Sequence, residues 1–248
     1  MSSKKNILIC GATYGLGFFI ANEFLKKDEN VIIVGKNHSK MKIAKKKIKS
    51  KNAFFYLCDL SNEKKVDLLM RKIKKKHNFI DLVVSNAGKS DMKKTGEENY
   101  SEWIRAYRLN FFLHTNIVQS FKKYFKNKKL KKIVIISSVA AYFDGNAPLS
   151  YSLAKNSLNN YCKIISGHLA DFNININTIS PGHILQKNNL WDKKIKKNKA
   201  KVFKMINNTV SLKRFCTPED VFNVINFLLS NKSNYITGTD LRVDGKTS

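Results

Sequence analysis

Short apolar runs alternate along the chain with longer segments whose apolar residues recur at helical spacing. The runs are rich in Ile, Val and Phe and indicate strands, whereas the longer segments are typical of helices. Strands are predicted over 6–10, 30–34, 53–57, 80–84, 131–137, 174–179 and 240–243, and helices over 16–27, 39–50, 63–77, 100–126, 149–172 and 218–230. This alternation predicts one α/β domain over residues 1–248, with a parallel sheet of about seven strands and helices on both faces.

One stretch interrupts the alternation. Residues Gln186 to Asn208 are polar and rich in lysine, and they include Trp191. A solvated, flexible loop is the interpretation we favour, and a segment that meets an anionic substrate is the alternative.

Glycines cluster where the first strand meets the first helix, with the spacing G-x3-G-x-G. A strand-to-helix turn of this kind directs backbone N–H groups and the positive end of the helix dipole at an anion. Glycine permits the tight turn and the close approach of a pyrophosphate. The candidate cofactor-binding residues of this loop are Gly11, Thr13, Tyr14, Gly15, Leu16 and Gly17.

The end of the second strand bears on which dinucleotide is bound. An acidic residue there would bond the adenosine ribose and indicate NAD(H). The sequence has Val34-Gly35-Lys36-Asn37 instead. Lys36 can meet a 2′-phosphate, so we favour NADP(H) as the cofactor and keep NAD(H) as the alternative.

A candidate acid/base pair lies in the helix predicted over 149–172. Tyr151 and Lys155 are four residues apart and share one helix face. A free phenol titrates near pH 10, and a neighbouring ammonium favours the phenolate and lowers its pKa. Ser138 follows the fifth strand, at the sheet edge where ligands bind in parallel sheets. The three residues predict proton exchange with a substrate oxygen.

The chain carries a formal net charge of +28, with 46 Lys and Arg residues against 18 Asp and Glu. Only five of the basic residues are Arg, whereas a nucleic-acid surface would use Arg for bidentate contacts. Asn and Ile are abundant too, so we interpret the charge as a lysine-biased composition. A nucleic-acid partner remains the less favoured alternative.

The four cysteines are scattered, without a C-x2-C pair or a histidine at metal-ligand spacing, so no metal site is expected. Cys10 and Cys58 lie in apolar runs and are predicted to be buried free thiols. No stretch approaches the roughly 18 apolar residues of a membrane span. We therefore expect a cytoplasmic protein without a membrane partner.

Further motifs recur along the chain. Asp59-Leu60, Asn86-Ala87-Gly88 and Ser180-Pro181-Gly182 follow the third, fourth and sixth predicted strands, Asn110 lies in the long helix, and the chain ends with Ile236-Thr237-Gly238 and Val243-Asp244-Gly245. Together with the glycine loop, Ser138, Tyr151 and Lys155, they give the whole chain a resemblance to the short-chain dehydrogenase/reductase family. The resemblance implies a Rossmann-type, doubly wound fold and a ketone/alcohol oxidoreductase activity.

The resemblance also implies a role for each position. Tyr151 exchanges the proton and Ser138 orients the substrate oxygen, while Lys155 binds the nicotinamide ribose and lowers the pKa of Tyr151. Asn110 holds a water in a proton relay. Asp59 contacts the adenine, Asn86 stabilises the sheet beside the cofactor and Ile184 approaches the carboxamide. The further cofactor contacts that it implies are Leu60, Ala87, Gly88, Pro181 and Gly182.

Some positions depart from the family pattern. Cys10 replaces a common Thr, and Tyr14 stands where many NADP(H)-dependent members carry a basic residue. Gln186 stands where a Thr usually helps to hold the nicotinamide, so Gln186 is expected to substitute for it or to leave binding looser.

The resemblance implies a substrate lid at about 183–210. The general pattern is similar to 3-oxoacyl-carrier-protein reductases, so a small-molecule or carrier-linked substrate is expected, with a sugar or polyol ketone of surface-polysaccharide synthesis as the alternative. The carrier would dock on Lys or Arg residues. The segment His168-Leu-Ala-Asp-Phe172 contains neither, whereas Lys128 and Lys129 could serve.

A homodimer or homotetramer is implied as well. Its candidate buried contacts are Phe111, Phe112, Tyr161 and Ile165.

A cofactor-binding regulator without catalysis is the alternative function of a different class. The presence of all four catalytic residues weighs against this alternative.

Overall fold

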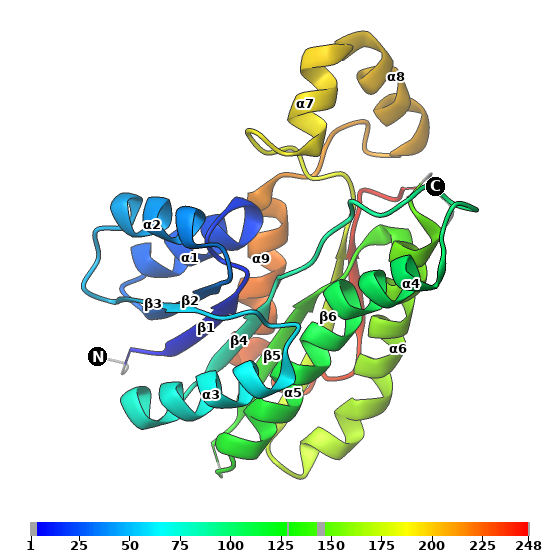
Figure 1. Ribbon diagram of the computed structural model, residues 1–248. Helices are drawn as coiled ribbons and strands as arrows, with labels where there is room; N and C mark the ends of the chain where they lie inside the picture. Colours follow the sequence, from blue (N-terminus) through cyan, green and yellow to red (C-terminus); the bar gives the residue numbers. More distant parts are fainter. Residues whose placement is uncertain (1–3, 128, 143–146, 248) are drawn as a thin grey trace.

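A seven-stranded parallel sheet forms the centre of the protein in the computed structural model, which describes residues 4–127, 129–142 and 147–247 (Figure 1). Its strand order is β3-β2-β1-β4-β5-β6-β7, and every neighbouring pair is parallel. The strands are β1 (Asn6–Cys10), β2 (Asn30–Gly35), β3 (Ala53–Leu57), β4 (Leu82–Ser85), β5 (Lys131–Ile136), β6 (Ile174–Pro181) and β7 (Asp240–Val243). The predicted doubly wound fold is confirmed.

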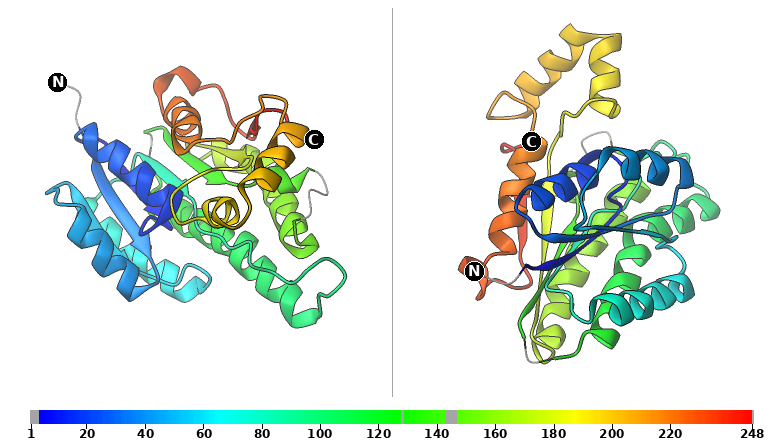
Figure 2. Two further views of the ribbon diagram at one scale, coloured as in Figure 1. Left: turned by 90° about the horizontal axis from the view of Figure 1, so that it is seen from above. Right: turned by 90° about the vertical axis from the view of Figure 1, so that its left-hand side faces the viewer.

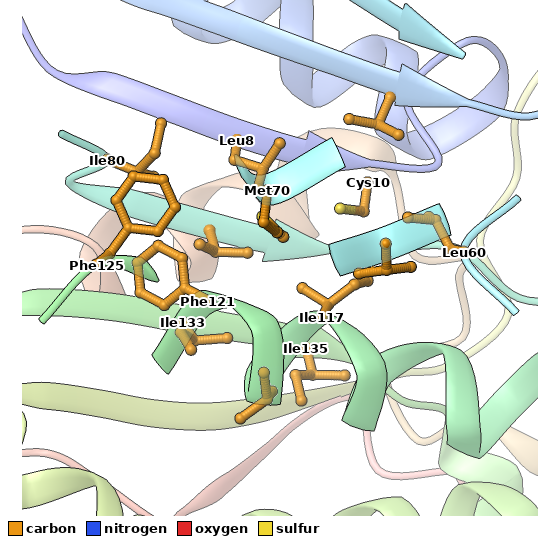
Figure 3. Close-up of a cluster of buried hydrophobic side chains, with 14 of the residues drawn as sticks. Leu8, Cys10, Leu60, Met70, Ile80, Ile117, Phe121, Phe125, Ile133 and Ile135 are labelled. Atoms are coloured by element: carbon orange, nitrogen blue, oxygen red, sulfur yellow. The ribbon is translucent and has the colours of Figure 1, made fainter. Parts of the chain in front are cut away.

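Helices cover both faces of the sheet (Figure 2). They are α1 (Gly15–Lys26), α2 (His38–Lys47), α3 (Glu63–His77), α4 (Tyr100–Tyr107), α5 (Leu113–Tyr124), α6 (Leu149–Ala170), α7 (Leu190–Lys197), α8 (Lys199–Thr209) and α9 (Pro218–Leu228). Alternate residues of β1 face opposite ways: Leu8 packs with α3, α5 and α6, whereas Ile7 packs with α1 and α9. Figure 3 shows the first of these two cores, in which Phe121 and Phe125 stack at 5.0 Å between ring centroids.

The helix predicted over 100–126 is divided. A π-helical segment, Arg108–Phe112, separates α4 from α5, and α5 ends at Tyr124. The π turn inserts extra backbone into the helix at Asn110.

The prediction of a flexible loop over Gln186–Asn208 is wrong, because the segment contains α7 and most of α8, which project from the body (Figure 1). Asn189 and Asn198 cap these two helices through their side chains. Val202 and Ile206 are buried in a small core of their own. Apolar residues at helical spacing therefore order a segment whose composition is dominated by lysine.

The structure also shows the burial of the cysteines and the character of the helices. Cys10, Cys58 and Cys162 are buried and free, as predicted for the first two. Within residues 4–127, 129–142 and 147–247, no helix combines the length and apolar character needed to cross a membrane.

Candidate active site

A cleft of about 700 Å³ opens at the carboxyl ends of the central strands. Every residue that the sequence singled out for cofactor binding or catalysis lines it, with the exception of Gly17. Further lining residues that the sequence analysis did not single out for this site include Asn37, Lys40, Ser61, Lys89, Ser90, Asn189, Leu190 and Trp191. The cleft therefore joins the candidate phosphate loop to the candidate acid/base pair.

The glycine loop runs from the end of β1 to the start of α1. Gly11 has φ 79° and Gly15 has φ 62°, in the left-handed region that favours glycine. A Cβ on Gly11 would lie 2.8 Å from Ala87 Cα, and a Cβ on Gly17 would lie 2.3 Å from Gly11 O. Gly17 thus packs beneath the loop instead of lining the cleft. The Asn86 side chain donates to Gly11 O at 3.1 Å and ties the loop to the end of β4.

Basic side chains gather at the far end of the cleft, beyond β2. Lys36 Nζ lies 3.9 Å from Asp59 Oδ2, and both side chains are partly exposed. Lys40 Nζ lies 4.5 Å from the centre of the Tyr14 ring. Asn37 caps α2 by accepting from Lys40 N at 2.8 Å, which fixes where the helix starts and therefore where Lys40 lies. The sequence did not single out Lys40, because its position beside the cleft depends on where α2 starts. Asn37, a residue type common at helix N-caps, is the signal that could have placed Lys40 in the first turn of that helix.

Ser138, Tyr151 and Lys155 meet at the other end of the cleft. Ser138 follows β5 and its Oγ accepts from Ala140 N at 3.2 Å. Burial raises the pKa of Tyr151, and a side-chain hydrogen bond with Ser138 acts in the opposite direction. Lys155 Nζ donates to Ile136 O at 2.8 Å. Burial lowers the pKa of Lys155 to about 7.

The predicted lowering of the Tyr151 pKa by Lys155 is not found. The pKa of Tyr151 is raised, because removal of the phenol from water outweighs the hydrogen bond with Ser138. The ammonium of Lys155 is directed to the backbone of β5, and burial disfavours its charge as well. Desolvation thus dominates both groups.

Asn110 lies in the π-helical segment and is fully buried. Its Oδ1 accepts from Lys89 N at 2.9 Å, and its Nδ2 donates to Ala106 O at 3.1 Å. A Cβ on Gly88 would lie 3.1 Å from Asn110 Oδ1 and 3.6 Å from Lys155 Nζ. Glycine at this position therefore lets Asn110 and Lys155 approach each other across the cleft floor.

Residues just after β6 cover the cleft. Ile184, Gln186, Leu190 and Trp191 line it, and the Trp191 ring lies 5.7 Å from that of Phe215. The Tyr14 hydroxyl donates to Asn188 O at 2.9 Å, so the glycine loop contacts this covering segment directly.

The strand-to-helix glycine loop and the buried polar groups fit a dinucleotide and a carbonyl or alcohol, and comparisons with known proteins agree. A family profile described as Enoyl-(Acyl carrier protein) reductase matches residues 11–246. The chain belongs to the short-chain dehydrogenase/reductase family, whose members are oxidoreductases of CH–OH and C=O groups.

Individual relatives cover nearly the whole chain. The 3-oxoacyl-[acyl-carrier-protein] reductase of Buchnera aphidicola subsp. Schizaphis graminum is 30% identical over 246 residues, with 98% of this chain and 96% of that protein covered. A diacetyl reductase [(S)-acetoin forming] of Staphylococcus epidermidis is 28% identical over 254 residues, with 98% of each covered. L-Sorbose reductase from Gluconobacter frateurii, solved with NADPH and L-sorbose, has the same fold, with a TM-score of 0.90 at 23% identity and coverage of 99% and 97%.

Proposed function

We propose that this chain interconverts a ketone and a secondary alcohol with a nicotinamide cofactor, Tyr151 being the acid and base. One observation carries the proposal: Ser138, Tyr151 and Lys155 line the same cleft as the glycine loop. The cofactor supplies or accepts the hydride when bound, and the protein supplies binding, orientation and proton exchange.

Ser138 and Tyr151 act on the substrate oxygen. During reduction the phenol gives its proton to that oxygen, and during oxidation the phenolate takes the proton back. The Ser138 hydroxyl donates a hydrogen bond to the same oxygen and orients it. Their side-chain interaction supports this shared task.

Lys155 and Asn110 serve the proton supply behind Tyr151. Lys155 returns a proton to Tyr151 and binds the nicotinamide ribose. Asn110 holds a water that connects Lys155 with solvent, a role supported by the approach of Asn110 Oδ1 and Lys155 Nζ to the same point above Gly88.

The other cleft residues hold the cofactor. Backbone N–H groups of the glycine loop and the start of α1 bind the pyrophosphate. Asp59 contacts the adenine, and Ile184 the carboxamide. The remaining contacts are Leu60, Asn86, Ala87, Gly88, Pro181 and Gly182, all of which line the cleft.

We favour NADP(H) over NAD(H). Lys36 and Lys40 lie on the adenosine side of the cleft, where no acidic residue ends β2, and can meet a 2′-phosphate. The Lys36–Asp59 pair is long and exposed, so it leaves Lys36 free to turn toward an anion.

The substrate that we place first is a 3-oxoacyl thioester, with residues 183–210 as its lid. Ile184, Leu190 and Trp191 give the cleft an apolar wall that suits an acyl chain. Of the two lysines considered for carrier docking, Lys129 is bound to Asp81 at 2.6 Å, and Lys128 lies outside the described residues. A sugar or polyol ketone is the second candidate, because Ser90 adds a polar group to the same cleft.

The test is a screen of acetoacetyl thioesters, ketoses and small diketones with NADPH and NADH, followed by absorbance of the reduced nicotinamide. Tyr151→Phe should lower kcat at least about 1000-fold, since the phenol is the proton donor, while NADPH binding measured by fluorescence persists. Exposed Tyr235→Phe is the matched control and should retain turnover. Wild-type rates in Tyr151→Phe would refute the mechanism. Cofactor binding without turnover of any carbonyl would favour a non-catalytic regulator.

A further inference from the structure

The Tyr14 side chain joins the glycine loop to the segment that covers the cleft. Its hydroxyl donates to Asn188 O at 2.9 Å, between residues 174 positions apart in the sequence. The side chain of Gln186 approaches the same loop, since a Cβ on Gly15 would lie 3.7 Å from Gln186 Oε1. The turn of residues 186–189 therefore rests against the loop that we propose binds the pyrophosphate.

The carbonyl that accepts this hydrogen bond is fixed to the start of α7. Asn188 N donates to Asp192 Oδ2 at 2.7 Å, and Asn189 Oδ1 accepts from Asp192 N at 3.0 Å as the N-cap of the helix. Asn188 has φ 65°, a left-handed conformation that Asn adopts more readily than most residues. The contact with the glycine loop thus also holds the start of α7, where Leu190 and Trp191 line the cleft.

The ring of Tyr14 has a neighbour of its own. Lys40 Nζ lies 4.5 Å from the ring centre, within the range of a cation–π interaction. Lys40 belongs to the first turn of α2 and lines the part of the cleft that we propose binds the adenosine. Tyr14 carries no charge itself, but its ring holds the charge of this lysine beside the cleft.

Folding stability is not where these contacts have their effect. Tyr14 is 47% exposed, so water competes for both contacts and they add little to the free energy of unfolding. They connect three segments that line one cleft, namely the glycine loop, α2 and the start of α7. Their consequence is therefore expected in what the cleft binds.

We propose that Tyr14 is a positioning residue for the cofactor: its hydroxyl holds residues 186–189 and α7 closed over the phosphate end of the cleft, and its ring holds Lys40 where a 2′-phosphate binds. The inference rests on the proposed function. Opening of the covering segment breaks the hydrogen bond to Asn188 O, so the hydroxyl slows the release of either dinucleotide. The ring acts on NADPH alone, because only NADPH carries the 2′-phosphate.

Tyr14→Phe removes the hydroxyl and keeps the ring. Release of NADPH and of NADH, followed by stopped-flow fluorescence, should accelerate by about fivefold for both, the effect of losing one hydrogen bond. The ratio of the two affinities should stay as in the wild type. Tyr100→Phe, at an 81% exposed position on α4, is the matched control and should change neither release rate. Wild-type release rates in Tyr14→Phe would overturn the role of the hydroxyl.

Tyr14→Leu removes the ring as well. The preference for NADPH over NADH should fall by about threefold relative to Tyr14→Phe, because the cation–π contact with Lys40 is lost. In the Tyr14→Leu background, Lys40→Ala should raise KM for NADPH by less than about twofold, compared with about fivefold in the wild type, since the two residues act together. Fully additive effects would overturn the role of the ring.

A measurement on the free protein tests the contact without cofactor or turnover. Amide hydrogen exchange in residues 186–197 should be about fivefold faster in Tyr14→Phe than in the wild type, because the segment opens more often, and exchange in α3 should be unchanged. Unchanged exchange in residues 186–197 would overturn the inference whether or not a substrate has been found. Faster exchange in Tyr14→Phe, together with a wild type that binds neither nucleotide, would instead refute the proposed function and with it the role of Tyr14 toward a cofactor.

Discussion

The buried position of Lys155 disfavours the positive charge that its proposed role requires. Its side chain is buried, and its pKa is lowered from 10.5 to about 7. A lysine whose folded pKa lies below its unfolded pKa destabilises the fold fully below pH 7, and this penalty fades as pH rises toward 10.5. The proposed proton relay therefore costs the fold stability.

Lys155→Met should abolish turnover and stabilise the fold. The gain in the free energy of unfolding should be about 1–3 kcal/mol at pH 6, after the freed Ile136 carbonyl offsets part of it, and should vanish above about pH 10. Thermal unfolding at several pH values measures it. Exposed Lys163→Met is the control, and a variant less stable than wild type at pH 6 would contradict the argument.

Lys36 and Lys40 should determine the cofactor preference. Lys36→Ala and Lys40→Ala should each raise KM for NADPH by about 5-fold or more and leave KM for NADH nearly unchanged, because only NADPH carries the 2′-phosphate. Lys42→Ala, on α2 with Lys40 but outside the cleft lining, should change neither KM. Equal effects on both cofactors would place the phosphate elsewhere.

At the scale of elements, the glycine loop is fixed by its contact with the end of β4. Gly11→Ala should weaken NADPH binding by about 10-fold or more, because the added Cβ would press on Ala87 Cα at 2.8 Å. Gly96→Ala is matched in backbone strain, with φ 87°, and its Cβ would meet no described atom within 4 Å. Fluorescence titration should show near wild-type binding in this control; a similar loss in both would mean that strain, not contact, is responsible.

The sequence predicted nearly all the elements because the strands other than β3 and β7 are largely buried, and because most of the glycine and polar motifs follow a strand end. It predicted neither the π turn at Asn110 nor the helices of residues 186–208. The π turn leaves no pattern in the sequence, because the same side chains fit the backbone hydrogen bonds of a π turn and those of an α-helix. In α7 and α8, lysines stand between the apolar residues such as Ile195 and Ile206 that order the segment, so its polar composition hides the helical spacing.

At the scale of the whole molecule, apolar residues remain exposed on the helices that carry the catalytic side chains. Phe112 is 47% exposed and Ile164 is 70% exposed, although Phe111 and Tyr161 pack together with ring centroids 5.8 Å apart. These residues support our proposal of a homodimer or homotetramer.

Light scattering coupled to size exclusion should find a dimer or tetramer at micromolar concentration. Phe112→Asp and Ile164→Asp should lower its mass, since a buried carboxylate would oppose association. Leu68→Asp, at a 63% exposed position on α3, is the control and should not. A monomeric wild type would contradict the proposal.

The strand order β3-β2-β1-β4-β5-β6-β7 places Lys36 and Lys40 beyond one side of the sheet centre and Ser138 beyond the other. Substitutions around β5 and β6 can alter the substrate specificity without changing the half of the cleft that we propose binds the adenosine. Descendants of such a chain could therefore exchange substrates while drawing on the same cellular pool of reducing equivalents. Selection can act on the two properties separately because the topology has already separated them.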